Sequence, residues 1–187
     1  RWSQAATTFV PTQATLAGYN DNSTNLTTVS AVNILQSLRL FTRITRVPLQ
    51  IKRRWKHTMV AGTIADFGWG VPATTTLVVP NGTCFRLTNS GQVQGVITFN
   101  STEIAIDNVK STVASNGNTI GGNLNMSNSY YTNNYFVYDI IIDDDNVVFT
   151  VQDTQTGEMI GILSLPVPNS AIKMWGATAL PYYQRIY

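Results

Sequence analysis

The sequence is poor in the residues that most enzymes use for covalent and acid–base chemistry. It has one cysteine, Cys84, and one histidine, His57, in 187 residues. A single cysteine excludes an intrachain disulfide, so we expect core packing to hold the fold together. An imidazole base could come only from His57, which lies among cations in RRWKHTM, and those charges are expected to lower its basicity. We therefore expect a buried thiol, a surface imidazole and no enzymatic activity.

Charged residues are also scarce. They make up 12% of the chain, about half of the usual share, and the net charge is only +2. Thr, Asn, Ser and Gln must therefore supply the polar surface, a composition that favours β-structure and Asn/Gly turns. This composition also suits extracellular or virion surfaces. No apolar run approaches the roughly 18 residues of a membrane-spanning helix, so we expect no membrane insertion.

The length fits one folded domain with an appended segment. Residues 1–31 are rich in small polar residues, and we expect them to form an extended N-terminal arm. Residues 32–187 are expected to form a single domain. Because the chain begins with arginine, we expect a processed product or a part of a longer polypeptide.

Short stretches of alternating apolar residues follow, joined by turn residues. PNG (80–82), TNSG (88–91), IDDDN (142–146) and DTQTGE (153–158) are typical hairpin turns, whereas GWG (68–70) is expected to end a strand. Residues 114–134 are expected to form a long Gly/Asn/Ser loop. Around IDDDN, one strand would bury Phe136, Tyr138, Ile140 and Ile142, and the next would bury Val147, Phe149 and Val151. The pattern predicts an all-β protein, an antiparallel β-sandwich or jelly roll.

A family resemblance rests on the order of these elements. In 136–166 a strand, an acidic bend, V-x-F-x-V, D-x-x-T-G, a strand and L-P follow one another, and LPYYQRIY (180–187) closes the chain. This order resembles the concanavalin A-like jelly roll, in its laminin-G-like version from bacteriophage and related virion proteins. VPNGTCFRLTNSGQVQGVITFNSTEI (79–104) is similar to the paired hairpins of that family. The resemblance implies a tail, fibre or capsid-decoration element, and many such domains bind host-surface sugars.

Aromatic side chains in loops and near the C-terminus are the candidates for sugar binding, because a pyranose face stacks on an aromatic ring. Trp69 lies between two glycines, Tyr130 and Tyr131 lie in the long loop, and Tyr182 lies near the end of the chain. Core packing or a subunit contact explains these residues equally well.

Cations cluster in the first third of the chain. Seven of the 12 lie within 18 positions: Arg39, Arg43, Arg46, Lys52, Arg53, Arg54 and Lys56. Residues 139–158 carry six acidic residues and no basic one. We expect the two regions to pair, either across neighbouring strands or between copies of the chain. An anionic glycan or lipopolysaccharide is an alternative partner, and a nucleic acid is a further one.

The acidic bend does not match a calcium loop. When Asp143 and Asp145 take the first two ligand positions of an EF-hand pattern, Val147 falls at the third. Asp143 and Asp145 remain weak metal candidates, and we expect no cofactor. A glycosidase would need two carboxylates about 5–9.5 Å apart. Glu103, Asp107 and Asp139 could supply them, but no E-x-D-x-x-E spacing occurs.

These observations favour a non-enzymatic virion surface protein that works with copies of itself or with other virion proteins and contacts host-surface glycans. The alternatives are a stand-alone carbohydrate-binding module or lectin and, third, a glycosidase of the same fold.

Overall fold

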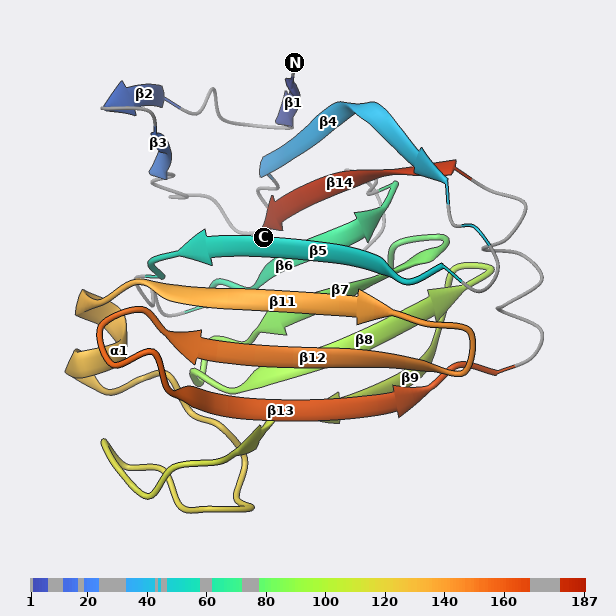
Figure 1. Ribbon diagram of the computed structural model, residues 1–187. Helices are drawn as coiled ribbons and strands as arrows, with labels where there is room; N and C mark the ends of the chain where they lie inside the picture. The colour runs from blue at the N-terminus through green and yellow to red at the C-terminus, as the bar shows by residue number, and fades with distance from the viewer. Residues whose placement is uncertain are drawn as a thin grey trace.

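The structure is a computed structural model, and it describes residues 2–6, 12–16, 19–23, 33–42, 44, 47–57, 62–71, 78–168 and 179–187. Two antiparallel sheets stack face to face (Figure 1). The predicted all-β sandwich is confirmed. Within the described part of the chain, no helix is long and apolar enough to cross a membrane.

The larger sheet has seven strands. In spatial order they are β1 (Trp2–Ala6), β4 (Asn33–Thr42), β14 (Ala179–Ile186), β6 (Ala65–Gly70), β7 (Gly82–Leu87), β8 (Val93–Phe99) and β9 (Thr102–Asn108). The C-terminal strand β14 thus lies between β4 and β6, although both of these strands are far from β14 in the sequence. Strands β6 to β9 lie side by side in chain order.

The smaller sheet has five strands and lies nearest the viewer in Figure 1. In spatial order they are β10 (Lys110–Ser111), β13 (Met159–Pro166), β12 (Asn146–Asp153), β11 (Phe136–Ile142) and β5 (Leu49–Trp55). A separate hairpin pairs β2 (Thr12–Leu16) with β3 (Tyr19–Ser23), and one short helix, α1 (Ser129–Asn133), lies beside the start of β11 (Figure 1).

The core lies between the two sheets and contains many aromatic residues. Alternate residues of a strand point to one face, and the predicted apolar faces of β11 and β12 are confirmed, because all seven residues are buried. The ring of Tyr138 meets Phe67 and Phe85 of the opposite sheet edge-on, at centroid distances of 5.1 and 5.3 Å. Phe149 meets Phe85 at 5.1 Å. These edge-to-face contacts join the sheets with the geometry that aromatic pairs favour.

The predicted turns at 88–91, 142–146 and 153–158 are confirmed, because each joins two paired strands. The hairpin predicted at 80–82 stays a prediction, because Gly82 begins β7 and residues 72–77 before it lie outside the described part. At the acidic bend the Asp143 amide donates to the Asn146 carbonyl at 2.9 Å, which joins β11 to β12. Gly91 and Gly157 close the turns at 88–91 and 153–158 with φ of +82° and +73°, a conformation that glycine adopts without steric cost.

The strand predicted to end at GWG does end there, because the last residue of β6 is Gly70. Gly68, however, lies inside the strand. A Cβ on Gly68 would lie 2.1 Å from the Thr83 carbonyl oxygen of β7. Glycine is therefore required here for close approach of two paired backbones and not for a turn.

In the predicted long loop at 114–134, hydrogen bonds from one buried side chain, Asn118, hold the backbone in place. Asn118 is 6% exposed. Its Oδ1 accepts from the Asn125 amide at 2.7 Å, and its Nδ2 donates to the Asn125 carbonyl and to the Tyr131 hydroxyl, both at 3.0 Å. The loop also contains α1, whose first turn is capped by the Asn128 side chain.

Within the predicted N-terminal arm, β1 pairs with β4 and extends the seven-stranded sheet. The β2–β3 hairpin pairs within itself. The predicted boundary between arm and domain at residue 31 stays a prediction, and residues 24–32 lie outside the described part.

Candidate binding site

One face of the five-stranded sheet points away from the core, and we call it the front face. Because Phe136, Tyr138 and Ile140 of β11 point inward, the residues between them point outward. Strand pairing places the outward residues of neighbouring strands beside one another. The front face comprises Gln50, Lys52 and Arg54 of β5, Val137, Asp139 and Ile141 of β11, Val148, Thr150 and Gln152 of β12, and Ile162 and Ser164 of β13.

Asp139 lies within this face, directly between Lys52 of β5 and Thr150 of β12. It is only 8% exposed. Gln50 Nε2 donates to Asp139 Oδ2 at 2.6 Å, whereas Asp139 Oδ1 is buried without a hydrogen-bond partner. An unpaired buried carboxylate oxygen lowers the free energy of unfolding, since water no longer solvates it. Such an atom calls for an explanation.

The edge of the front face is cationic. β5 is an edge strand, and its outward residues Lys52 and Arg54, together with Lys56 just beyond it, are exposed. Exposed charges on an edge strand oppose pairing with other chains. Arg53 points inward instead, where it donates to the Tyr182 hydroxyl at 3.1 Å.

The strand that carries the cations does pair with a strand of the acidic stretch, but the predicted ion pairs between their side chains are not formed in the part of the chain that the structure describes. β5 does lie beside β11, and Lys52 is opposite Asp139. Yet within the described residues no ion pair joins Lys52, Arg54 or Lys56 to a carboxylate. Arg43, Arg46 and the side chain of Arg39 lie outside the described residues.

An exposed aromatic residue lies at the α1 end of the front face. Tyr135 is 41% exposed, and the guanidinium carbon of Arg54 lies 4.8 Å from its ring centroid. This distance is typical of a cation–π contact. Tyr135 could not be predicted from the sequence, because its partner Arg54 is 81 positions earlier and only the β5–β11 pairing brings them together.

Tyr130, a predicted sugar contact, is half-buried beside Phe136, with 6.3 Å between the ring centroids. Its hydroxyl donates to the carboxylate of Asp153. This hydrogen bond to a carboxylate, followed by burial, raises the pKa of Tyr130 to about 12. The ring is thus oriented by a buried residue, and Tyr130 stays a predicted contact outside the front face.

The other three predicted aromatic contacts are corrected by their burial. Trp69, Tyr131 and Tyr182 are 0%, 2% and 8% exposed. Trp69 points into the core, and its indole nitrogen donates to the Phe41 carbonyl at 3.2 Å. The flanking glycines suggested an exposed ring, but they serve close backbone packing. A ring enclosed by protein has no free face on which a sugar could stack.

Cys84 and His57, the one possible thiol nucleophile and the one possible imidazole base, lie at different sheets. Cys84 belongs to a small buried cluster on the outer side of the seven-stranded sheet, and His57 follows β5 of the other sheet. Burial raises the pKa of the Cys84 thiol to about 12, which suppresses the reactive thiolate. The predicted core thiol is confirmed, and His57 is half-buried where a surface imidazole was expected.

At the acidic bend, an aspartate side chain accepts a hydrogen bond from the backbone of the bend itself. Asp143 and Asp145 are exposed, and Asp143 Oδ1 accepts from the Asp144 amide at 2.7 Å. The part of the chain that the structure describes contains no group of three His, Cys, Asp or Glu residues that could hold a metal ion.

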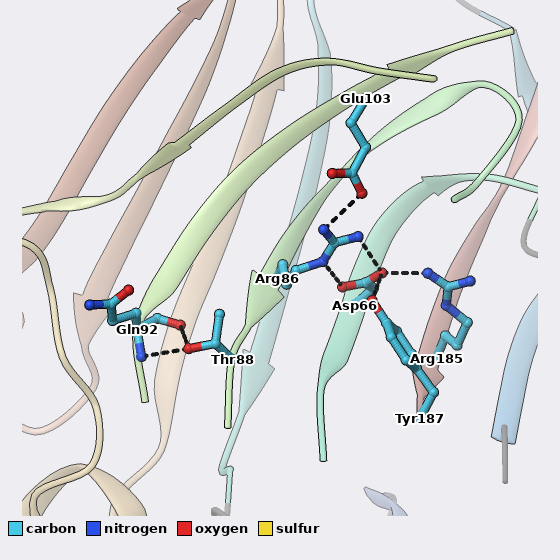
Figure 2. A network of polar contacts seen from close by, with 7 residues as sticks. All are labelled: Asp66, Arg86, Thr88, Gln92, Glu103, Arg185 and Tyr187. Carbon is cyan, nitrogen blue, oxygen red and sulfur yellow. Dashed lines mark hydrogen bonds and ion pairs between the residues drawn. The ribbon is translucent and has the colours of Figure 1, made fainter. Parts of the chain in front are cut away.

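The outer side of the seven-stranded sheet carries a charge network (Figure 2). Asp66, fully buried, accepts from Arg86 at 2.9 and 3.3 Å, from Arg185 at 2.6 Å and from the Tyr187 hydroxyl at 3.2 Å. Arg86 also contacts Glu103 at 2.8 Å. The network contains two arginines and two carboxylates, so its charges cancel, as charges in a buried network must. Glu103 is therefore engaged on one sheet while Asp139 lies on the other, so these two carboxylates do not flank one cleft.

Comparison with protein-family models finds no match to the sequence, and comparison with curated proteins finds none. Solved structures with a similar fold are found. The exoplasmic/lumenal domain of VIP36, in a Ca²⁺/Man-bound form, aligns with a TM-score of 0.54 and 8% identity over 98% of this chain and 75% of that one. A legume lectin-like domain from Entamoeba histolytica aligns with a TM-score of 0.54 and 8% identity over 99% and 79%.

A third structure is the CBM2 module of the evolved Dit protein of Lactobacillus casei BL23 phage J-1. It aligns with a TM-score of 0.48 and 10% identity over 82% of this chain, which spans 60% of the module's chain. The first two likenesses define the class: the chain has the β-sandwich fold of legume-lectin-like, concanavalin-like domains. At these identities the likeness concerns the fold alone.

Proposed function

We propose that this protein is a non-enzymatic glycan-binding protein of a virion surface and that the front face of its five-stranded sheet contacts host-surface sugars. The observation that carries the proposal is Asp139, a buried carboxylate within an outward face with one oxygen left unpaired. Sugar hydroxyls are donors that can satisfy such an acceptor once the side chains around it move aside.

The surroundings of Asp139 suit a sugar. Val137 and Ile141 flank it on β11 and are half-buried, so they offer apolar surface to the C–H faces of a ring. Gln50 and Thr150 add polar groups that can both donate and accept. Tyr135 at the α1 end supplies an exposed ring. A few polar groups within an apolar surface are typical of small-ligand sites.

If the Asp139 carboxylate contacts a sugar, its replacement should reduce the affinity for glycans. Asp139→Asn should weaken binding by at least about tenfold, since a hydrogen bond to a charged group is replaced by a weaker one. The variant should unfold at the same or a higher temperature, because the changed oxygen has no partner. A printed array of neutral and acidic glycans measures the binding, and calorimetry measures the melting temperature.

Asp145→Asn is the matched control, because it removes an equal charge at the exposed bend and should leave binding within twofold. If the wild-type chain binds no glycan, or Asp139→Asn binds as tightly as the wild type, the proposal fails.

The virion setting is supported by the sequence: few charges, a surface of Thr, Asn, Ser and Gln, and the order of strands and turns in 136–166. Copies of the chain or other virion proteins would then be its partners. The alternative is a stand-alone carbohydrate-binding module or lectin. Cryo-electron microscopy of particles separates the two, because copies of the chain around a symmetry axis are required by the first and absent from the second.

A further inference from the structure

We infer that the ligand of the front face is an anionic glycan, a polysaccharide bearing carboxylate or sulfate groups, which lies along β5. This inference rests on the proposed function and names the chemical class of its ligand. It starts from the cations of β5, for which the described residues provide no acidic partner.

The cations form a regular row. Lys52, Arg54 and Lys56 occupy alternate positions and are all exposed. Alternate residues of a strand are about 6.6 Å apart, so the row spans about 13 Å along the sheet edge. A linear chain with repeated negative groups can follow such a row, whereas a single small anion would use only one of its positions.

The acidic residues that could have neutralised the row are used elsewhere or are distant from it. Asp139 is bound by Gln50, and Asp153 accepts from Tyr130 and from the Gln155 amide. The bend that carries Asp143 follows the end of β11 that pairs with Leu49, at the opposite end of β5 from Arg54. The positive charge of the row therefore stays available to a ligand.

Asp139 distinguishes a glycan from a nucleic acid. A phosphate backbone would place negative charge beside this carboxylate, and the orphaned oxygen needs a donor that a phosphate does not provide. A uronic acid or a sulfated sugar presents hydroxyls next to its anionic group, so one residue of the glycan can meet Asp139 and Lys52 together. Single-strand binders also use several aromatic rings for base stacking. Among the described side chains, Tyr135 is the one exposed large aromatic residue.

The test uses the full chain and four probes: polygalacturonate, heparin, neutral dextran and a single-stranded oligonucleotide. Biolayer interferometry at low salt should show tighter binding to polygalacturonate or heparin than to dextran. The double variant Lys52→Gln/Arg54→Gln should lose about tenfold or more in affinity for the acidic glycan. Lys110→Gln is the control, because it removes a cation at the opposite edge of the same sheet that already contacts Asp107 at 3.8 Å. It should change affinity by less than threefold.

Other outcomes overturn the inference. Equal binding of dextran and acidic glycans, with sensitivity to Asp139→Asn, would reject the anionic class and leave the proposed function standing. Binding of no glycan at all would reject both. Oligonucleotide binding as tight as that of the acidic glycans, and unaffected by Asp139→Asn, would identify a phosphate-binding edge. If the double variant dissociated an oligomer and left glycan affinity unchanged, the row would be a subunit contact.

Discussion

At the scale of single residues, His57 shows how burial changes a group that the sequence places on the surface. Its ring meets Trp55 edge-on at 5.2 Å. Burial lowers the pKa of His57 from 6.5 to about 4. The sequence predicted the correct direction but gave neighbouring cations as the cause, whereas loss of hydration is the cause in the structure, because the charged imidazolium needs water.

This pKa predicts a pH dependence of stability. Between pH 6.5 and 4 the unfolded chain binds a proton at His57 that the folded chain does not bind, so stability falls as pH falls through this window. We expect the wild-type free energy of unfolding to drop by on the order of 2 kcal/mol more than that of His57→Gln between pH 7 and pH 5. Urea denaturation of both proteins at each pH measures the difference.

All carboxylates are common to the two proteins, so their titration cancels in the comparison. Parallel stability curves for the wild type and His57→Gln would show that the imidazole keeps its ordinary pKa in the folded state.

At the scale of elements, β6 shows why a strand can require glycine. Its paired partner β7 approaches so closely at Gly68 that a Cβ would lie 2.6 Å from the Cα of Cys84. Contacts of this kind are far inside van der Waals distance and involve backbone atoms, which cannot rotate away. The glycines of β6 therefore set the spacing of the seven-stranded sheet beside Trp69.

Gly68→Ala should consequently destabilise the fold by at least about 2 kcal/mol, because overpacking a well-packed site forces the backbone to shift. Gly122→Ala is the control. There the nearest atom to an added Cβ is the Thr119 hydroxyl oxygen, and a side-chain hydroxyl can rotate, so the loss should stay below about 1 kcal/mol. Guanidinium denaturation measures both. Equal stability of the two variants would contradict the close-packing argument.

At the scale of the whole molecule, the network around Asp66 joins distant parts of the chain. Asp66 of β6 binds Arg86 of β7 and Arg185 of β14, and the Asp66–Arg185 contact spans 119 positions. The carboxylate raises the pKa of both arginines against the opposing effect of burial, so the guanidinium groups stay charged inside the sheet. The C-terminal strand is thus held by charge as well as by its backbone hydrogen bonds.

Removing the shared carboxylate should be costly. Asp66→Asn leaves two buried guanidinium groups with one carboxylate, and we expect a loss of about 3–5 kcal/mol, as for a broken buried ion pair. Asp107→Asn breaks the exposed contact with Lys110 and should cost less than about 1 kcal/mol. Chemical denaturation compares the two. A loss below about 1 kcal/mol for Asp66→Asn would show that Asp66 does not hold the network together.

The sequence by itself determined the local structure of this protein. The hairpins of 136–166 could be predicted because each depends on neighbouring residues: alternation assigns two faces to a strand, and Asp, Asn and Gly form the turn between two strands. The same reasoning identified the all-β class and the apolar faces of β11 and β12. It missed the role of Gly68, because a glycine that permits close approach looks the same in sequence as one that ends a strand.

The tertiary structure alone decided which faces are covered and which residues meet. Gln50 and Asp139 lie 89 positions apart, and their contact depends on β5 pairing with β11, which no local pattern specifies. The same holds for Trp69, whose ring is core because its face of β6 packs toward the five-stranded sheet. Alternation gives every strand two faces, and only the stacking of the sheets determines which one meets water. For that reason the structure places the candidate site on the front face around Asp139, whereas the sequence had predicted it at the aromatic residues.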